Sequence, residues 1–183
     1  MDIKDVDIID NFLSDELLSG ARNAINDSKW VHEGASVTST GSTGSTRFWY
    51  CELGETPMFK CMILDAIQKR YRQKFKVNRV YANGQTFGQD GSFHQDDTLE
   101  NAYTFLIYLS DINPHNVDEI GGFTQIKMKD KIVNIEPYMR RAVMFKSNLF
   151  HRGLAPSRQS DILRQTIALK LIAYSGSKEI QYI

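Results

Sequence analysis

Three things are scarce in this sequence: net charge, cysteine and long apolar runs. Its 22 lysines and arginines balance 22 aspartates and glutamates, so the overall charge gives no reason to expect a nucleic acid or an anionic membrane as partner. Cys51 and Cys61 could form one disulfide, but without a secretion signal we expect two free thiols. The longest apolar run, Phe105–Leu109, is far shorter than the roughly 18 residues that a membrane span needs.

The length and the first residues favour a small cytoplasmic protein. The segment Met1–Val6 carries three charged residues and has no apolar core, so it does not look like a signal peptide. A chain of 183 residues fits one domain and buries enough surface to fold without disulfides. We expect a single domain over residues 1–183, with helical support over about 1–76 and a core of strands over about 77–175.

Two segments have the apolar spacing of helices. Ser14 is a suitable N-cap, and the apolar residues after it lie on one helical face: Leu17, Leu18, Ala21, Ala24 and Ile25. Thr56 and Pro57 provide a second cap with proline at the first helical position. The apolar residues that follow recur every four positions: Phe59, Ile63, Ile67, Tyr71 and Phe75. We expect that face to pack on a sheet.

After Phe75 the sequence changes to short β-rich runs separated by turn signals such as Asn83-Gly84 and Gly121-Gly122. The expected strands are Val77–Ala82, Ser92–Asp96, Ala102–Leu109, Phe123–Lys127, Lys131–Ile135, Arg141–Phe145 and Arg164–Ala173. Seven short strands at this spacing predict a sandwich or jelly roll. Because the helices precede the strands, we expect a mainly β (α+β) protein with its helices on one outer face.

One segment, Ser36–Thr46, has a single apolar residue in eleven and can bury almost nothing. It is either a surface loop or a lid that orders over a bound substrate. The aromatic run Phe48-Trp49-Tyr50 follows it directly and would serve as a strand that anchors such a lid.

His94 and Asp96 are separated by one residue, so on a strand their side chains would share a face and reach one ion. A His-x-Asp pair is common by chance and needs a second histidine. His32 and His115 lie in apparent loops, whereas His151 follows the strand that ends at Phe145. Two histidines and one aspartate are the facial triad of non-haem iron(II) oxygenases.

Arg164 opens an alternating strand on which Arg164, Thr166, Ala168 and Lys170 share one face. If that face lines a barrel interior, the guanidinium needs an anion, and its planar fork suits a carboxylate. The alternative is a strand-end arginine paired with a surface acid. Tyr108 also has two possible roles: it is either a hydroxyl donor inside the barrel or an ordinary core tyrosine.

Taken in order, these motifs resemble a known family. The order is Tyr81-Ala-Asn-Gly-Gln85, His94-x-Asp96, Tyr108-Leu-Ser110, Gly121-Gly122, Ile135-Glu-Pro137, Ala142-Val-Met-Phe145, His151 and Arg164-x-x-Ile-x-Leu-x-Leu171. The pattern, which covers roughly Val77 to Ala173, looks like the 2-oxoglutarate- and iron(II)-dependent dioxygenases, and most like prolyl 4-hydroxylases. The resemblance implies a double-stranded β-helix (jelly roll) fold.

The resemblance also implies roles for individual residues. His94, Asp96 and His151 match the iron ligands. Arg164 matches the basic residue that pairs with the distal carboxylate of 2-oxoglutarate, and Tyr108 matches a hydroxyl donor to the same group. Tyr81 matches a tyrosine that faces the cofactor. The implied cofactors are Fe(II), the co-substrate 2-oxoglutarate and O2, with ascorbate as reductant.

By the same resemblance the activity is hydroxylation of a C–H bond, with a prolyl residue in a peptide or protein as the first choice of substrate. Related halogenating enzymes lack the carboxylate ligand, so the presence of Asp96 favours hydroxylation. Two departures bear on the details. The gap from His151 to Arg164 is long, which makes Arg158 a rival for the carboxylate, and Lys170 stands where a related prolyl hydroxylase has an aromatic residue.

Other functions stay open at this point. The first alternative is a hydroxylase of a free amino acid, another small molecule or an alkylated base. A base would need a local basic patch, and we interpret the candidates Lys127–Lys131 and Arg140-Arg141 as solvated turns. A jelly-roll module that retains a metal without catalysis would form no succinate, and a zinc hydrolase would give Arg164 no role.

Overall fold

The computed structural model of the protein describes residues 5–36 and 46–174. Within these residues the chain forms two antiparallel sheets. The larger sheet has seven strands, in the spatial order β1 (Val6–Ile9), β8 (Ala142–Lys146), β5 (Ala102–Tyr108), β10 (Arg164–Ala173), β4 (Phe75–Gln85), β3 (Phe48–Glu52) and β2 (Val31–Gly34). The smaller sheet has three strands, in the order β7 (Lys131–Ile135), β6 (Thr124–Met128) and β9 (His151–Gly153).

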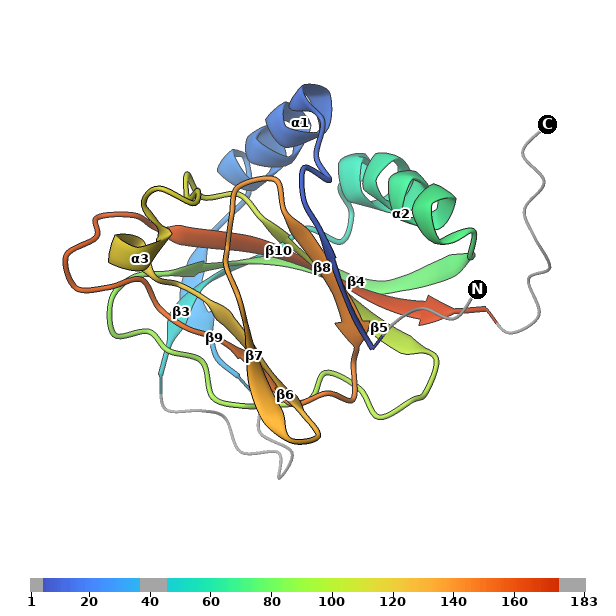
Figure 1. Ribbon diagram of the computed structural model, residues 1–183. Helices are drawn as coiled ribbons and strands as arrows, with labels where there is room; N and C mark the ends of the chain where they lie inside the picture. The colour runs from blue at the N-terminus through green and yellow to red at the C-terminus, as the bar shows by residue number, and fades with distance from the viewer. Residues whose placement is uncertain (1–4, 37–45, 175–183) are drawn as a thin grey trace.

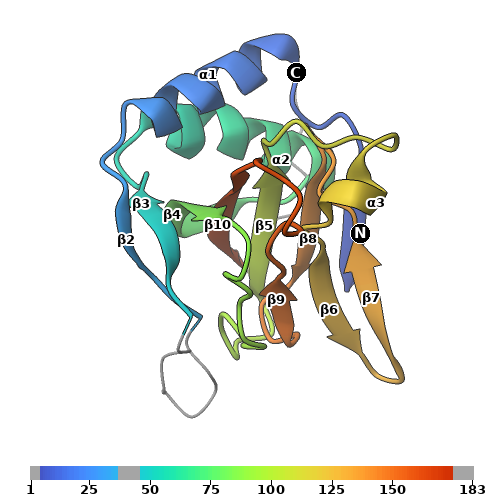
Figure 2. The ribbon, with the colours of Figure 1, turned by 90° about the vertical axis from the view of Figure 1, so that its left-hand side faces the viewer.

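The helices cover the outer face of the larger sheet, as Figure 2 shows, and this confirms the expected arrangement. They are α1 (Asp15–Asn26) and a π-helical segment η1 (Met58–Ile63) that runs directly into α2 (Leu64–Tyr71). The short α3 (Val117–Ile120) packs separately, in a small cluster with Ile112. The side chain of Ser14 caps α1 by accepting a hydrogen bond from Leu17 N at 3.2 Å.

Helix and sheet meet through alternating apolar residues. Phe59, Ile63 and Ile67 are fully buried on the helical side. The strands present every second residue to them, among these Phe105, Ile107, Ile167 and Leu169. A smaller apolar cluster joins the two sheets, with Tyr108, Val143 and Phe145 on one side and Ile126 and Ile135 on the other. The inner face of the larger sheet therefore turns toward the smaller sheet (Figure 1).

The order of helices and strands was predicted well, but several local expectations were wrong. The second helix ends at Tyr71, where Arg72 adopts a left-handed conformation (φ 48°), so Phe75 begins β4 instead of ending the helix. Ser92–Asp96 is not a strand: of this segment only His94 forms an isolated bridge, to His151. His32 lies on β2 and not in a loop.

The Asn83-Gly84 turn was also wrong, because β4 continues through both residues to Gln85. Gly84 pairs with Trp49 and Gln165 in the middle of the sheet. A Cβ at Gly84 would lie 3.2 Å from the side chains of both Trp30 and Leu163. The glycine is therefore a point of close packing against bulky neighbours, which sequence alone cannot distinguish from a turn signal.

Three further expectations can be compared with the described residues. Cys51 is buried and Cys61 exposed, and both are free thiols, as predicted. The helices within these residues are too short or too polar to cross a membrane. Most of the candidate lid, residues 37–45, lies outside the described part of the chain.

Candidate active site

Three side chains predicted as metal ligands come together at one end of the inner face. Ligand atoms of His94, Asp96 and His151 all lie within 4.8 Å of one another. Nε2 of His94 is 3.4 Å from Oδ1 of Asp96, and Nε2 of His151 is 3.2 Å from Oδ2. Two ligands at right angles, each about 2.1 Å from a metal, lie about 3 Å apart, so these separations fit one octahedral face.

Backbone pairing brings these residues together without a regular strand. His94 and His151 exchange two backbone hydrogen bonds, of 3.0 and 2.9 Å, across their isolated bridge. Asp96 N donates to Ser147 O at 2.9 Å. The convergence therefore comes from contacts with the segment around β9, and not from the side-chain alternation of a strand.

Both imidazoles are held in the form that binds metal. Nδ1 of His94 lies 2.9 Å from the carbonyl of Ser92, and Nδ1 of His151 lies 2.9 Å from the carbonyl of Leu149. A carbonyl oxygen only accepts hydrogen bonds, so each Nδ1 carries the proton and, in the neutral ring, each Nε2 keeps its lone pair for a ligand. Burial lowers the pKa of His151, although Asp96 opposes the shift, so the neutral ring is favoured.

The carboxylate between the histidines is buried and charged. Burial alone would raise the pKa of Asp96, but the adjacent Lys170 ammonium opposes this and is the main group that holds the pKa well below its usual range. Thr104 Oγ1 donates to Oδ2 of Asp96 at 2.5 Å, and Lys170 forms an ion pair with the same oxygen. Two imidazole nitrogens and a carboxylate are the donor set of a divalent transition metal, so these residues fit the implied iron(II).

Arg164 lies on β10 and is buried, with only 2% of its surface exposed. Its Nε donates to Gly122 O at 2.5 Å, Nη1 to Gln85 Oε1 at 2.7 Å and Nη2 to Thr124 Oγ1 at 2.8 Å. No carboxylate within the described residues forms a salt bridge with it, and burial lowers its pKa. A guanidinium has five N–H donors, so one on each terminal nitrogen is left for a bound anion.

Two glycines make room for this guanidinium. Gly122 has φ +77°, and a Cβ there would lie 3.1 Å from Cδ of Arg164. A Cβ at Gly153 would lie 2.9 Å from Oε1 of Gln85 and 3.1 Å from Nη1 of Arg164. Any larger side chain at either position would displace the arginine.

Thr124 links Arg164 to Tyr108. The Tyr108 hydroxyl donates to Thr124 Oγ1 at 2.8 Å, so this oxygen accepts from both neighbours. With both lone pairs used, the threonine keeps its own proton to donate into the cavity that it lines. Tyr108 is itself almost fully buried, and burial raises its pKa, so it stays protonated.

A cavity of about 390 Å³ joins the two histidines to Arg164. Thr124 pairs with Gly153, beside the guanidinium, while Ile126 pairs with His151 two residues further along the same ladder. Two residues of strand span about 7 Å. The distance between these two backbone positions is close to the length of a five-carbon dicarboxylate, so the cavity offers room for one between the histidines and Arg164.

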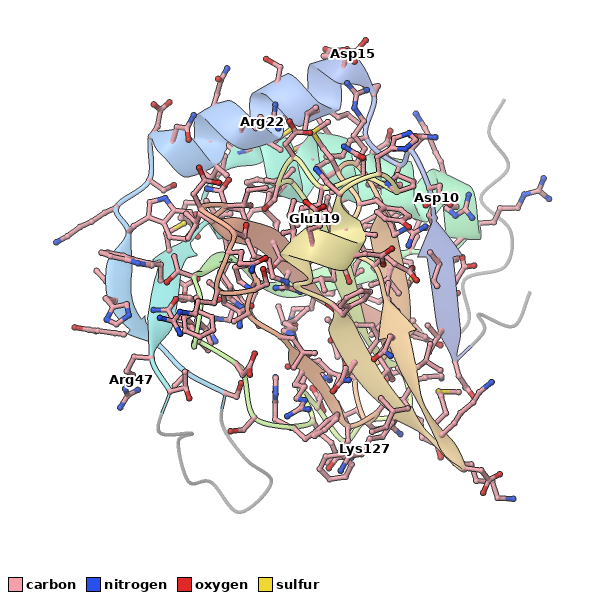
Figure 3. All side chains as sticks on the ribbon, turned by 60° about the vertical axis from the view of Figure 1, so that its left-hand side comes forward. Asp10, Asp15, Arg22, Arg47, Glu119 and Lys127 are labelled. Carbon is pink, nitrogen blue, oxygen red and sulfur yellow. The ribbon has the colours of Figure 1, made fainter. Side chains whose placement is uncertain are left out.

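The opposite part of the cavity is lined by Tyr81, Arg79 and Lys170. The Lys170 ammonium lies 5.3 Å from the centre of the Tyr81 ring, and the Arg79 guanidinium lies 4.8 Å from the same ring. Arg79 is exposed and pairs with Glu52 at 2.8 Å. Arg47, just before β3, also lines the cavity, and Figure 3 shows it at the edge of the molecule remote from α1.

The other basic residues and the histidine that the sequence singled out lie outside this cavity. Arg158, the rival to Arg164, is exposed. Arg141 is not in a solvated turn as expected: it is buried and pairs with Asp10 at 2.6 Å and Glu136 at 2.8 Å. Lys127 lies on β6, with its ammonium 4.2 Å from the centre of the Phe93 ring (Figure 3). His115 is exposed, as predicted.

Sequence reasoning named six residues of the site, His94, Asp96, His151, Arg164, Tyr108 and Tyr81, and missed the neutral ones around them. Gln85, Thr104 and Thr124 hold the charged groups through hydrogen bonds. The alternation of Arg164 and Thr166 on β10 marked one inner face. No comparable signal marked Thr124, because threonine is common in any strand.

No protein-family model and no curated protein matches the sequence. Solved structures do match the fold. A prolyl hydroxylase from Trichoplax adhaerens, in complex with a hypoxia inducible factor oxygen degradation domain peptide fragment, is 16% identical with a TM-score of 0.69, covering 92% of this chain and 83% of that one. A Pseudomonas putida prolyl-4-hydroxylase is 16% identical with a TM-score of 0.60, covering 93% of each chain.

A third match is HygX from Streptomyces hygroscopicus, with nickel and 2-oxoglutarate bound. It is 10% identical with a TM-score of 0.65, covering 92% of this chain and 82% of that one. The fold is thus the jelly roll of the 2-oxoglutarate oxygenases. Prolyl hydroxylases are among the solved structures that it resembles over nearly the whole chain.

Proposed function

We propose that this protein is a 2-oxoglutarate- and Fe(II)-dependent dioxygenase that hydroxylates a C–H bond. The observation that carries the proposal is the joint geometry of the metal triad and Arg164. A buried guanidinium without an anion among the described residues lies beside Gly153, two residues along β9 from His151 of the triad. A metal-binding module or a zinc hydrolase would have no use for this second feature.

The residues of the chain have distinct roles in this proposal. His94, Asp96 and His151 hold iron(II) through one face, which leaves three positions for the co-substrate and dioxygen. Arg164 binds the far carboxylate of 2-oxoglutarate through its two free N–H groups, and Thr124 adds its hydroxyl proton. Tyr108 supports this contact by fixing the orientation of Thr124.

Iron(II) and 2-oxoglutarate, when bound, would supply the oxidation: dioxygen converts 2-oxoglutarate to succinate and carbon dioxide and places its second oxygen atom in the substrate C–H bond. Asp96 keeps the carboxylate position of the triad filled, which favours hydroxylation over transfer of a halide. Ascorbate would keep the metal reduced. Tyr81 lines the cavity on the side away from Arg164, where the substrate would enter.

We further propose a prolyl residue in a peptide as the first candidate for the substrate. The support is the likeness to two prolyl hydroxylases, one of them in complex with a peptide. At 16% identity this likeness concerns the fold, so the substrate needs a test of its own. A free amino acid or another small molecule is the alternative.

The test is binding and turnover of 2-oxoglutarate. Protein loaded with Fe(II) and ascorbate should form succinate, and a peptide array should show substrates that gain one oxygen atom in mass. Asp96→Ala should bind metal more weakly and lose succinate formation, whereas Asp97→Ala, one residue away and outside the triad, should retain both. If metal-loaded protein does not bind 2-oxoglutarate at all, the proposed function is wrong.

A further inference from the structure

Lys170 is a buried cation beside the metal triad. It lies on β10, its side chain is only 19% exposed, and its ammonium points into the cavity that holds His94 and His151. Among the described residues its one anionic partner is Asp96, and Thr104 Oγ1 lies 3.5 Å away. Burying an ammonium is costly unless an anion faces it.

Asp96, the ion-pair partner of Lys170, is also a predicted metal ligand. Oδ2 of Asp96, which pairs with Lys170, is also the oxygen 3.2 Å from the ligand nitrogen of His151. A metal in the triad draws the charge of this carboxylate to itself. Metal binding therefore leaves the Lys170 ammonium, whose side chain is only 19% exposed, without full compensation.

The co-substrate cannot supply the missing anion at this position. Arg164 and Lys170 lie on the same face of β10 but six residues apart, which is roughly 20 Å along the strand. A 2-oxoglutarate molecule held by Arg164 at one end would have its other carboxylate on the metal, so neither carboxylate is free to pair with Lys170. The ammonium thus faces the side of the metal on which the substrate must bind.

The charged residues that line the cavity also favour an anionic substrate. Its lining contains Arg47, Arg79, Arg164 and Lys170 but only one acid, Glu33. Among the buried groups alone, the two charges of iron(II) would balance those of 2-oxoglutarate, and Asp96 would balance one of the two cations Arg164 and Lys170. These groups therefore keep one uncompensated positive charge, and Lys170 is the cation that no part of 2-oxoglutarate pairs with.

We propose that Lys170 recognises a carboxylate of the substrate, so that this protein acts on a molecule with an acidic group close to the reacting C–H bond. The inference rests on the proposed function and narrows its substrate class. The carboxylate belongs either to a free amino acid or to an acidic residue next to the target residue of a peptide. In both cases the ammonium and the Tyr81 ring form the wall against which that group packs.

A purely structural role for Lys170, as the counter-ion of Asp96, predicts something different. Removing the ammonium would then change metal affinity and thermal stability but would not change which substrates bind. The distinguishing quantity is the ratio of the dissociation constants of an acid and its uncharged amide. Hydrogen bonds to charged groups are worth enough to make that ratio about ten to 100.

The experiment measures this ratio by calorimetry on protein loaded with Mn(II) and 2-oxoglutarate without oxygen. One arm compares free amino acids with their amides, and the other compares prolyl peptides that carry Asp or Asn beside the proline. Both arms are repeated with Lys170→Met, with Lys170→Arg, and with Lys131→Met as a control, because Lys131 is an exposed lysine outside the cavity.

We expect at least one acid to bind about tenfold or more tightly than its amide, and the arm in which this occurs identifies the source of the carboxylate. The preference should vanish in Lys170→Met and persist in Lys170→Arg and Lys131→Met. If no acid in either arm is preferred, or if the preference survives in Lys170→Met, the inference is wrong. Binding of 2-oxoglutarate in the same samples tests the proposed function separately.

Discussion

Replacing Arg164 with methionine should abolish tight binding of 2-oxoglutarate while leaving metal binding intact. The guanidinium offers two free N–H groups to the distal carboxylate, and each hydrogen bond to a charged group is worth about 1.5–3 kcal/mol. A loss of about 3 kcal/mol at the lower end corresponds to a dissociation constant at least about 100-fold higher. Calorimetry on Mn(II)-loaded protein under nitrogen measures it directly.

Arg158→Met is the matched control, because Arg158 is the nearest rival in sequence and is exposed. It should leave the dissociation constant unchanged. Arg164→Lys keeps the charge but loses the fork, and one ammonium cannot serve Gly122, Gln85, Thr124 and a carboxylate together. We expect an intermediate affinity. Normal binding in Arg164→Met, or weakened binding in Arg158→Met alone, would refute the assignment.

Three further outcomes are expected. Asp96→Ala should bind divalent metal at least about tenfold more weakly by equilibrium dialysis, since it removes one of three ligands; unchanged affinity would contradict the triad. At pH 8 a maleimide should modify exposed Cys61 but not Cys51, whose pKa burial raises to about 11, and mass spectrometry of native and unfolded protein should show one and two adducts. Phe59→Ala, at a fully buried position, should lower the unfolding free energy by about 3–5 kcal/mol in urea.

The parts of the fold that were predictable are those with strong local patterns. The expected strands Lys131–Ile135 and Arg164–Ala173 have the bounds of β7 and β10, and Ser14 caps α1 as its sequence suggested. These elements combine clear alternation or helical spacing with a cap or turn at the end. In these elements the secondary structure that the local sequence favours is also the one that buries its apolar residues, so tertiary packing does not override the local preference.

Other elements depend on distant partners. Strand β9 has three residues, and it exists because His151 and Gly153 pair with β6. Segment 92–96 has the composition of a strand, yet it offers a single bridge, to His151, and otherwise follows a path set by the hydrogen bond from Asp96 to Ser147. No window of sequence contains that information, since the contacts lie more than 50 residues away.

The candidate site was predicted through its charged residues because charge is conspicuous in a buried strand, whereas the residues that orient those charges are neutral. Thr124 and Gln85 show why this matters. Each accepts a hydrogen bond from Arg164, so the guanidinium is held in place without an acid that would neutralise it. An acid at either position would make a better ion pair but would occupy the donors that an incoming carboxylate needs. Because Thr124 and Gln85 are neutral, Arg164 keeps its charge uncompensated and two of its donors free, and it can therefore bind a carboxylate.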